Sequence, residues 1–486
     1  MTYDHTREAL GARRLTATAL AFSLLGLLGC ADLSGISPQS SLRDATSLGL
    51  TTAPSDAFAP GAQWWLTFND TQLNGLIEQA LVNNPSLHMV QTRLTRAQAG
   101  ADITAAAAKP QLNASVDATQ QLYTANGMIP APLAGSVKSS GTAQLSGSWE
   151  LDFFGKNQTA LAAALGNTRA AQADAQAARV LLASSVARTY FQLVRLHAQG
   201  EVAQRQLAQR KQALQLVRDR VNAGLDTRLE LLQAEGALPE AQLQIETLQE
   251  QLTLAQNSLQ ALIGQPNRPL ALILPSLGAI NRIAIANTLP SDLLGRRADV
   301  AAARWRVEAA TQDVGSAKAQ FYPNINLVAF AGFSSIGLDR LVSAGSQQWG
   351  VGPALRLPIF DAGRLRANLA GKTAELDAAI ESYNAAVVEA VHEVTDQITS
   401  SQAITRQQAE QQTAQTYAES AYAMTLQRYQ AGLGNYLHVL TAEAAVLNQP
   451  RQNVELAARA IDTQLLLIRA LGGGYRDEPA TTLAQQ

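Results

Sequence analysis

The chain contains the same glycine-centred turn twice, and this duplication constrains its fold more than any other feature. RVNAGLDTRLELLQAE at 220–235 and RYQAGLGNYLHVLTAE at 428–443 align at a constant offset of 208, with eight identical positions among sixteen. A second match, at an offset of 213, pairs Arg93 with Arg306 and Pro110 with Pro323. Two matches at nearly equal offsets predict an internal repeat, so we expect the same structural unit in each half of the chain.

Each repeat is predicted to contain, in chain order, a helical segment, two strands and two long helices. After each matched proline, apolar and polar residues alternate, which is typical of a half-buried strand. The segments around each glycine turn carry helical spacing with Ala at many contact positions. The first repeat is predicted over 63–263, with short helices within 70–109, strands at 111–123 and 139–154, and long helices at 156–222 and 226–263. The second is predicted over 290–472, with a helix at 296–320, strands at 323–334 and 347–360, and long helices at 363–431 and 435–471.

The N-terminus predicts export and lipidation. Residues 1–29 have a charged start and a short apolar run, as a secretory signal does, and they end before Cys30, the single cysteine of the chain. The local sequence LLGC resembles a bacterial lipobox, which implies a lipid on Cys30; a plain signal peptide is the alternative. Residues 30–62 then form a lipidated tether, 264–289 a linker between the repeats, and 473–486 a C-terminal tail.

Composition and motifs argue against nucleic-acid binding and catalysis. Lys and Arg number 37 against 39 Asp and Glu, so the chain lacks the basic excess of nucleic-acid-binding proteins. Its five histidines have no metal-ligand spacing, and no HExxH, GxSxG or Walker-type loop is present. We therefore expect neither an enzyme nor a metal site, and no cofactor apart from the covalent lipid on Cys30.

Four amphipathic strands in an exported lipoprotein predict a membrane protein of the α+β class. In lipid every backbone polar group must be paired, so strands span only as a closed barrel. Bacterial barrels begin at eight strands, so four strands cannot close alone and several copies must share one barrel. A helix over 156–222 would be about 100 Å long at 1.5 Å per residue, far longer than the roughly 30 Å hydrocarbon core. The long helices are therefore expected to form a helical tube in the periplasm.

Several motifs together resemble the outer membrane factor (TolC-like) efflux proteins, in particular the NodT-type lipoprotein branch. The resemblance extends from the lipobox to about Gly474 and is carried by LLGC, WWLTFNDTQLNGLIEQALVNNPSL, GSWELDFFGK, LPSDLLGRRADVAAAR, AQFYPNINL, GPALRLPIFDAGR and YQAGLGNYLHVLTAE. It implies a lipid-anchored homotrimer in the outer membrane, with a twelve-stranded barrel and an α-helical periplasmic tunnel. It also implies a periplasmic adaptor (membrane fusion protein) and an inner-membrane RND-type pump as partners, with drugs or other small molecules conducted passively.

The resemblance also implies roles for residues at the two turns. The positions that match adaptor contacts at the periplasmic tips are Gly224, Leu225, Gly432 and Leu433. The positions that match the tunnel aperture are Tyr429, Leu437, His438 and Thr441. Many relatives carry acidic residues where this chain has His438 and Thr441. Our hypothesis is that His438 makes the aperture pH-sensitive; the alternative is a solvated polar residue near a helix start.

Two other functions remain open from the sequence. The first alternative, still within the channel class, is the outer membrane exit duct of a type I protein secretion system. Outside it, a non-channel periplasmic coiled-coil scaffold lipoprotein would also have long helices and a lipid anchor. The four alternating strands favour a channel, as do Trp149 and Trp349, which suit a membrane interface.

Overall fold

The computed structural model describes residues 33–43, 60–266, 268–280 and 293–476. The chain divides into two compact units. We call residues 1–42, 95–170 and 303–383 the strand unit, and residues 43–94, 171–302 and 384–486 the hairpin unit. The predicted signal peptide, Cys30, most of the tether, and parts of the linker and tail lie outside the described residues.

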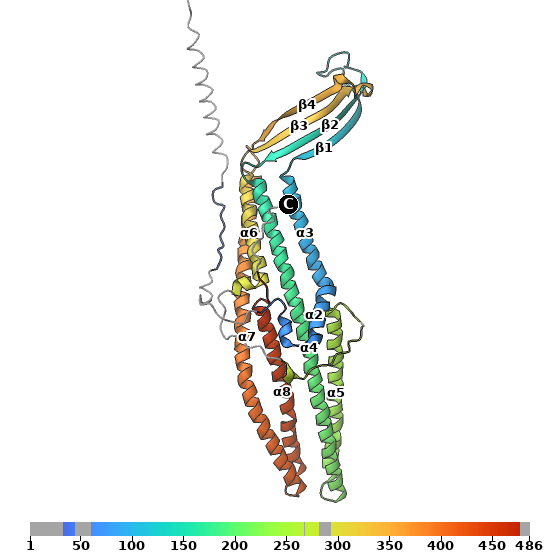
Figure 1. Cartoon of the computed structure of the whole chain (residues 1–486), viewed down its shortest axis with the longest axis vertical. Helices are drawn as coiled ribbons and strands as arrows, with labels where there is room; N and C mark the ends of the chain where they lie inside the picture. The colour runs from blue at the N-terminus through green and yellow to red at the C-terminus, as the bar shows by residue number, and fades with distance from the viewer. Residues whose placement is uncertain (1–32, 44–59, 267, 281–292, 477–486) are drawn as a thin grey trace, which may run out of the picture. The chain divides into compact units, whose positions relative to one another are not determined.

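The strand unit contains one antiparallel sheet in the order β1–β2–β3–β4 (Figure 1). Its strands are β1 (Gln111–Leu122), β2 (Val137–Leu151), β3 (Asn324–Ile336) and β4 (Gln347–Arg356). The central pairing joins the two repeats, because β2 pairs with β3 from Ser140↔Ile336 to Leu151↔Ile325. The outer sides of β1 and β4 have no partner strand within the described ranges.

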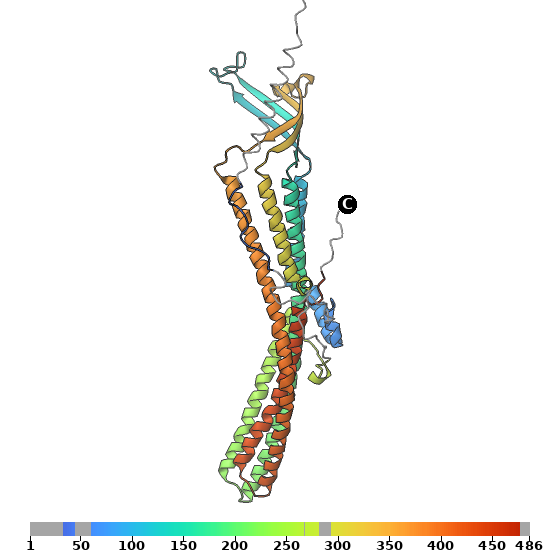
Figure 2. The same cartoon turned by 90° about the vertical axis from the view of Figure 1, so that its left-hand side faces the viewer.

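Within the strand unit, the described residues leave most of this sheet uncovered. The helices of the unit leave from one end of the sheet (Figures 1 and 2). As a result β1 is exposed along its whole length, and the apolar side chains Leu112, Val116, Trp349, Val351 and Leu355 are all exposed. Because burying apolar surface is favourable, this apolar surface requires a cover from outside the described residues.

Long helices continue from the sheet, and small residues let them pack closely. α3 (Pro85–Ala107) and α6 (Ala298–Ala319) lead into β1 and β3, while α4 (Lys156–Asn222) and α7 (Arg364–Gln430) follow β2 and β4. In the strand unit, a Cβ on Gly166 would lie 3.0 Å from the Cβ of Ala309. Near this contact the guanidinium of Arg169 lies 4.6 Å from the ring centre of Trp305.

The hairpin unit contains two antiparallel helix pairs: α4 with α5 (Arg228–Leu262), and α7 with α8 (Tyr436–Ala470) (Figure 2). Its largest hydrophobic cluster packs the short helices η3 (Trp64–Phe68) and α2 (Thr71–Asn83) against the long ones. Trp64, Ile77 and Leu259 are buried there. Asp70 caps α2 by accepting from the backbone N–H of Gln72, 2.9 Å away, and also accepts from the Tyr190 hydroxyl at 2.5 Å.

Some boundaries differ from the sequence prediction. The short helices predicted within 70–109 are α2 and α3, and the second ends at Ala107; they are separate because Pro85 disfavours a helical backbone at Asn84. Asn84 instead accepts from the backbone N–H of Ser86 at 2.9 Å and caps α3. The predicted strand 347–360 ends at Arg356, two residues before Pro358, which has no N–H to donate. Within the described ranges no helix is long and apolar enough to cross a membrane.

Candidate functional site: the tips of the two helical hairpins

The two repeated turns have the same backbone geometry. Gly224, after α4, has φ +72°, and Gly432, after α7, has φ +74°. In both turns the residue after the glycine donates its N–H to a carbonyl five residues back: Leu225 to Arg220 at 2.9 Å, and Leu433 to Arg428 at 2.8 Å. This is the hydrogen-bond pattern of a Schellman C-cap, which requires a left-handed residue. The duplicated sequence therefore encodes a duplicated helix stop.

The helices that follow the turns begin with different caps. Thr227 and Glu230 form a capping box at the start of α5, in which the Thr227 N–H donates to Glu230 at 2.9 Å. At the start of α8, the side chain of Asn435 accepts from the backbone N–H of His438 at 3.2 Å. Both arrangements satisfy backbone donors in the first helical turn, and so fix where each returning helix starts.

A polar network joins the two hairpins at their tips. Arg220 donates to Asp226 at 2.9 Å within the first hairpin, and to the carbonyl oxygen of Tyr429 in the second at 3.0 Å. The Tyr429 hydroxyl donates to Asp226, and the Arg220 guanidinium lies 4.3 Å from the Tyr429 ring centre. We call Arg220, Asp226 and Tyr429 the tip network.

The tip network shifts the acidities of its members. Desolvation would raise the pKa of Asp226, but hydrogen bonds from Arg220 and Tyr429 outweigh it and leave that pKa lowered. Burial, followed by the hydrogen bond to Asp226, raises the pKa of Tyr429. At neutral pH the network therefore holds an ionised carboxylate between a cation and a neutral phenol, which is its most favourable charge arrangement.

A small hydrophobic cluster lies against the network and includes residues of both hairpins. Its buried members are Leu214, Val217, Ala234, Tyr429, Tyr436 and Val439. The rings of Tyr429 and Tyr436 are tilted, with centres 5.8 Å apart. The tips are thus joined by packing as well as by hydrogen bonds.

The residues that the sequence assigned to the tips and the aperture differ in their exposure to solvent. Leu225 and Leu433 are exposed at the two tips, where an external partner can reach them. Leu437, His438 and Thr441 are exposed on the first turns of α8. Tyr429, which the sequence grouped with them, is only 1% exposed and lies between the hairpins.

Sequence reasoning missed Arg220 and Asp226 as functional residues. Arg220 was one of the identical positions of the repeat, but Asp226 corresponds to Gly434 and so was not matched. A charged residue that occurs at only one of two otherwise similar turns was the available signal. The predicted lipidation site, Cys30, lies outside the described residues.

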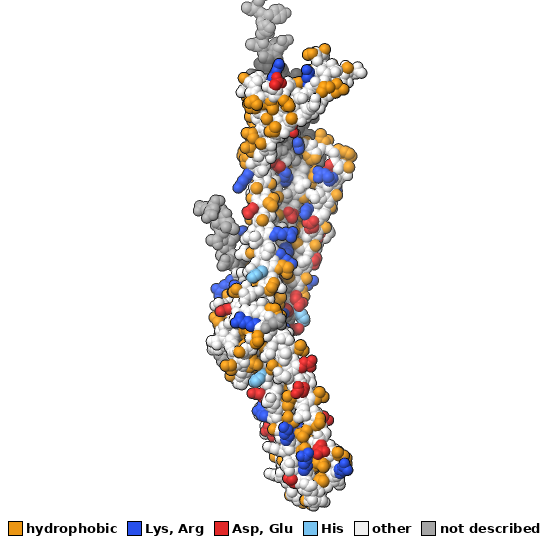
Figure 3. Space-filling view, turned by 90° about the vertical axis from the view of Figure 1, so that its right-hand side faces the viewer, with side chains coloured by type: hydrophobic (Ala, Val, Ile, Leu, Met, Phe, Trp, Pro, Cys, Tyr) orange, Lys and Arg blue, Asp and Glu red, His pale blue; other side chains and the backbone are white. Residues whose placement is uncertain are grey.

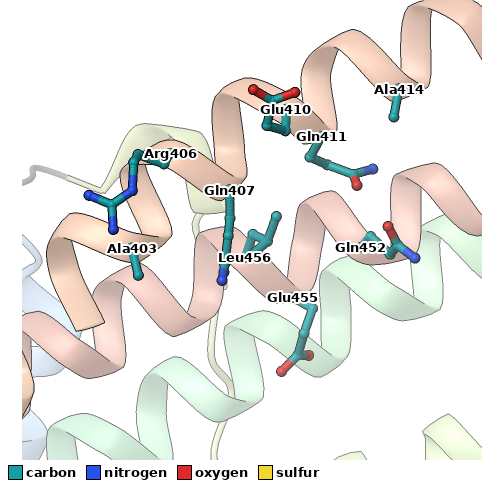
Figure 4. A pocket seen from close by; sticks show the side chains of 9 residues that line it. All are labelled: Ala403, Arg406, Gln407, Glu410, Gln411, Ala414, Gln452, Glu455 and Leu456. Carbon is teal, nitrogen blue, oxygen red and sulfur yellow. The ribbon is translucent and has the colours of Figure 1, made fainter. Parts of the chain in front are cut away.

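An open groove of about 600 Å³ runs between α7 and α8 and is lined by Ala403, Arg406, Gln407, Glu410, Gln411, Ala414, Gln452, Glu455 and Leu456 (Figure 4). Glu455 accepts from Arg195 of α4 at 2.9 Å, and Gln411 donates to the side chain of Gln449 at 2.8 Å. These contacts of Glu455 and Gln411 hold helices together. The residues that line the groove include no Ser, Thr, Cys or Lys that could act as a nucleophile.

The described surface differs between the sheet and the helices. On the face shown in Figure 3, hydrophobic side chains gather over the sheet, whereas charges of both signs are scattered along the helices. Among the residues that the structure describes, no three His, Cys, Asp or Glu side chains are placed to hold a metal ion.

Comparisons with known proteins agree with this arrangement. The family described as "Outer membrane efflux protein" matches residues 76–265 and 289–473. The multidrug resistance outer membrane protein MdtQ of Escherichia coli O6:H1 is 32% identical over 464 residues, covering 91% of this chain and 96% of that protein. The fusaric acid resistance protein FusA of Burkholderia cepacia is 36% identical over 368 residues, 74% of this chain and 69% of that one.

Solved structures show the same fold. The outer membrane protein VceC of Vibrio cholerae superposes with a TM-score of 0.81 at 38% identity, covering 85% of this chain and 99% of that chain. The open state of the MtrE outer membrane channel of Neisseria gonorrhoeae gives a TM-score of 0.77 at 25% identity, covering 91% and 98%. The chain belongs to the outer membrane efflux protein family. The resemblance found in the sequence is confirmed, and the protein is an outer membrane channel component of a tripartite efflux system.

Proposed function

We propose that three copies of the chain form the channel, with their sheets closed into one twelve-stranded barrel and their long helices continued as a periplasmic tunnel. The observation that carries this proposal is the four-stranded sheet, whose two edges lack partners among the described strands and whose apolar side chains are exposed. An open edge in lipid leaves backbone groups unpaired, at a cost of several kcal/mol for each group. Pairing β4 of one copy with β1 of the next removes both edges.

The cargo is a drug or another small toxic molecule, and the protein performs no chemistry on it. The names of the relatives, multidrug resistance and fusaric acid resistance, support this class of cargo. An inner-membrane RND-type pump would supply the energy, and a periplasmic adaptor would join pump to channel. A lipid on Cys30 would anchor each copy in the outer membrane. The efflux names favour this cargo over the protein substrates of a type I secretion duct.

The tips would be both docking site and gate. Leu225 and Leu433, exposed beside the glycine turns, would contact the adaptor. Leu437, His438 and Thr441 would surround the aperture, with His438 giving it pH sensitivity in place of an acidic ring. The tip network would hold the hairpins of one copy together while the aperture is closed, since it joins Asp226 of the first hairpin to Tyr429 of the second.

Cysteine accessibility in the full-length protein tests the barrel. Asp117 and Val116 are neighbours on β1 and point to opposite faces of the sheet. In planar bilayers, a charged, membrane-impermeant thiol reagent should reduce the conductance of Asp117→Cys, because the polar face of β1, on which residue 117 lies, would line the lumen. Val116→Cys, the matched control, should be unaffected. Equal modification of both variants, or an absence of conductance, would overturn the proposal.

A further inference from the structure

Glu443 is the second member of a duplicated pair, but its environment differs from that of the first. Its counterpart Glu235 is partly exposed and accepts from Arg218 at 3.0 Å. In the second hairpin the position that corresponds to Arg218 is Leu426. Glu443 is only 4% exposed, and its Oε1 has no hydrogen-bond partner among the described residues. The repeat has kept the carboxyl group but has lost its ion-pair partner.

The groups around Glu443 come from three helices. Arg210 of α4 is the charged neighbour, and Tyr436 of α8 lies within electrostatic range of the carboxyl, as does Tyr422 of α7. Arg210 is committed elsewhere, because its Nη1 donates to the Ala237 carbonyl of α5 at 2.6 Å and lies 3.6 Å from the Glu240 carboxylate.

Glu443 and Arg210 therefore lie near each other without forming an ion pair. The Nε of Arg210, like Oε1 of Glu443, is buried with no hydrogen-bond partner in the described part of the chain. A second cation, Arg451 of α8, interacts electrostatically with Arg210. A buried carboxylate with no partner is strongly disfavoured, whereas the protonated acid is neutral and is tolerated.

The closed packing thus favours the protonated acid. Burial raises the pKa of Glu443 above its ordinary value of 4.5, and the charge of Arg210 only partly opposes this shift. Exposure of the side chain would return the pKa to the ordinary range. Packing of α8 on its neighbours is then coupled to the uptake of a proton.

We propose that Glu443 is a proton-binding site that links protonation to the contact between the two hairpins. With the proton bound, α8 packs on α4 as the structure shows; with the proton lost, the carboxylate moves toward solvent and α8 separates from α4. Because the packed state binds the proton, low pH favours packing of α8 on α4. This preference falls as pH rises through the carboxyl pKa of the packed state. The inference depends on the hairpin packing and not on the channel role.

The experiment is hydrogen exchange of the full-length, detergent-extracted protein between pH 5 and pH 8. Exchange of amides in 436–450, divided by the intrinsic rate at each pH, should rise with pH in the wild type. The rise should reach at most about tenfold per pH unit, because one proton is linked. Glu443→Gln, a neutral mimic of the acid, should remove this dependence. Glu235→Gln, the repeat-related control, should behave as the wild type.

Infrared spectroscopy provides a second readout that does not depend on that variant. In the acidic part of this pH range, the wild type and Glu235→Gln should show a protonated-carboxyl band that Glu443→Gln lacks. If Glu443→Gln does not fold, Glu443→Asp should shift the band while keeping a carboxyl. A wild-type exchange profile that is flat or falls with pH would overturn the proposal. So would a wild-type dependence retained in Glu443→Gln, or a band that neither variant changes.

Discussion

Asp226, in the turn of the first hairpin, accepts a hydrogen bond from the hydroxyl of Tyr429 at the end of α7 in the second. The two residues are 203 positions apart in the chain. Arg220 supports the pair by donating to Asp226 and to the carbonyl oxygen of Tyr429. A single carboxylate thus joins the two halves of the duplication at the turns where we place the gate.

Removing the Tyr429 hydroxyl should loosen the tips. Tyr429→Phe keeps the ring in its cluster but deletes the hydrogen bond to Asp226, which is of a kind that contributes about 1.5–3 kcal/mol when one partner is charged. We expect a larger open-channel conductance in planar bilayers and little change in folding. Tyr417→Phe, at an exposed site on α7, is the control. Identical conductance of the two variants would show that the network does not hold the aperture.

Acid should loosen the same contact. Because the folded-state pKa of Asp226 is lowered below 3.8, the carboxylate contributes stability that is fully present above that value. The contribution is lost as pH falls through the lowered pKa. Tip mobility, measured by spin labels on the two turns, should therefore rise in strong acid in the wild type. In Asp226→Asn it should be high already at neutral pH, and a variant as rigid as the wild type would contradict this account.

Two glycines with positive φ should differ sharply in their tolerance of alanine. A Cβ added to Gly432 would meet open space, so Gly432→Ala should cost about 1–2 kcal/mol from backbone strain alone. A Cβ on Gly472 would lie 1.8 Å from the carbonyl oxygen of Arg296, so the backbone must move. We expect Gly472→Ala to cost more than about 4 kcal/mol. The midpoints of thermal unfolding, followed by circular dichroism, compare the two variants, and equal midpoints would contradict the prediction.

The buried guanidinium of Arg297 should be far more important for stability than an exposed one. It is 7% exposed and donates to Asp299 at 2.7 Å, to Glu393 at 2.6 Å and to the carbonyl oxygen of Ala470 at 3.3 Å. Arg297→Met removes the partner of Asp299 and leaves Glu393 paired with Arg469 alone, at 2.7 Å, so it should cost about 3 kcal/mol, the low end for breaking a buried pair.

The control for this prediction is Arg304, whose exposed pair with Glu308 spans 3.4 Å. Arg304→Met should cost less than about 1 kcal/mol, as surface ion pairs do. Equal unfolding midpoints for the two variants would mean that Arg297 does not hold the hairpin unit together.

The sequence contained the local features of this fold but not its long-range contacts. The glycine turns were predictable because a left-handed C-cap favours glycine at 224 and 432, and the repeat displayed both. The strands were predictable from their alternation. The pairing of β2 with β3 joins the two repeats, and no local pattern specifies it.

The same limit applies to the site. Asp226 and Tyr429 meet across 203 positions, so composition and spacing could not connect them. Glu443 matched Glu235 in sequence, yet one is buried and the other is partly exposed, and Leu426 replaces the arginine of the first hairpin. Which neighbours surround a repeated residue depends on packing, and packing is set by the whole hairpin pair.

The most direct test of the central claim is the native mass of the protein extracted in detergent from an outer-membrane fraction. We predict a complex of three chains, because four strands with two open edges need partners to close a barrel. A stable monomer under the same extraction would contradict this claim, since a single copy would leave the edges of β1 and β4 unpaired in lipid.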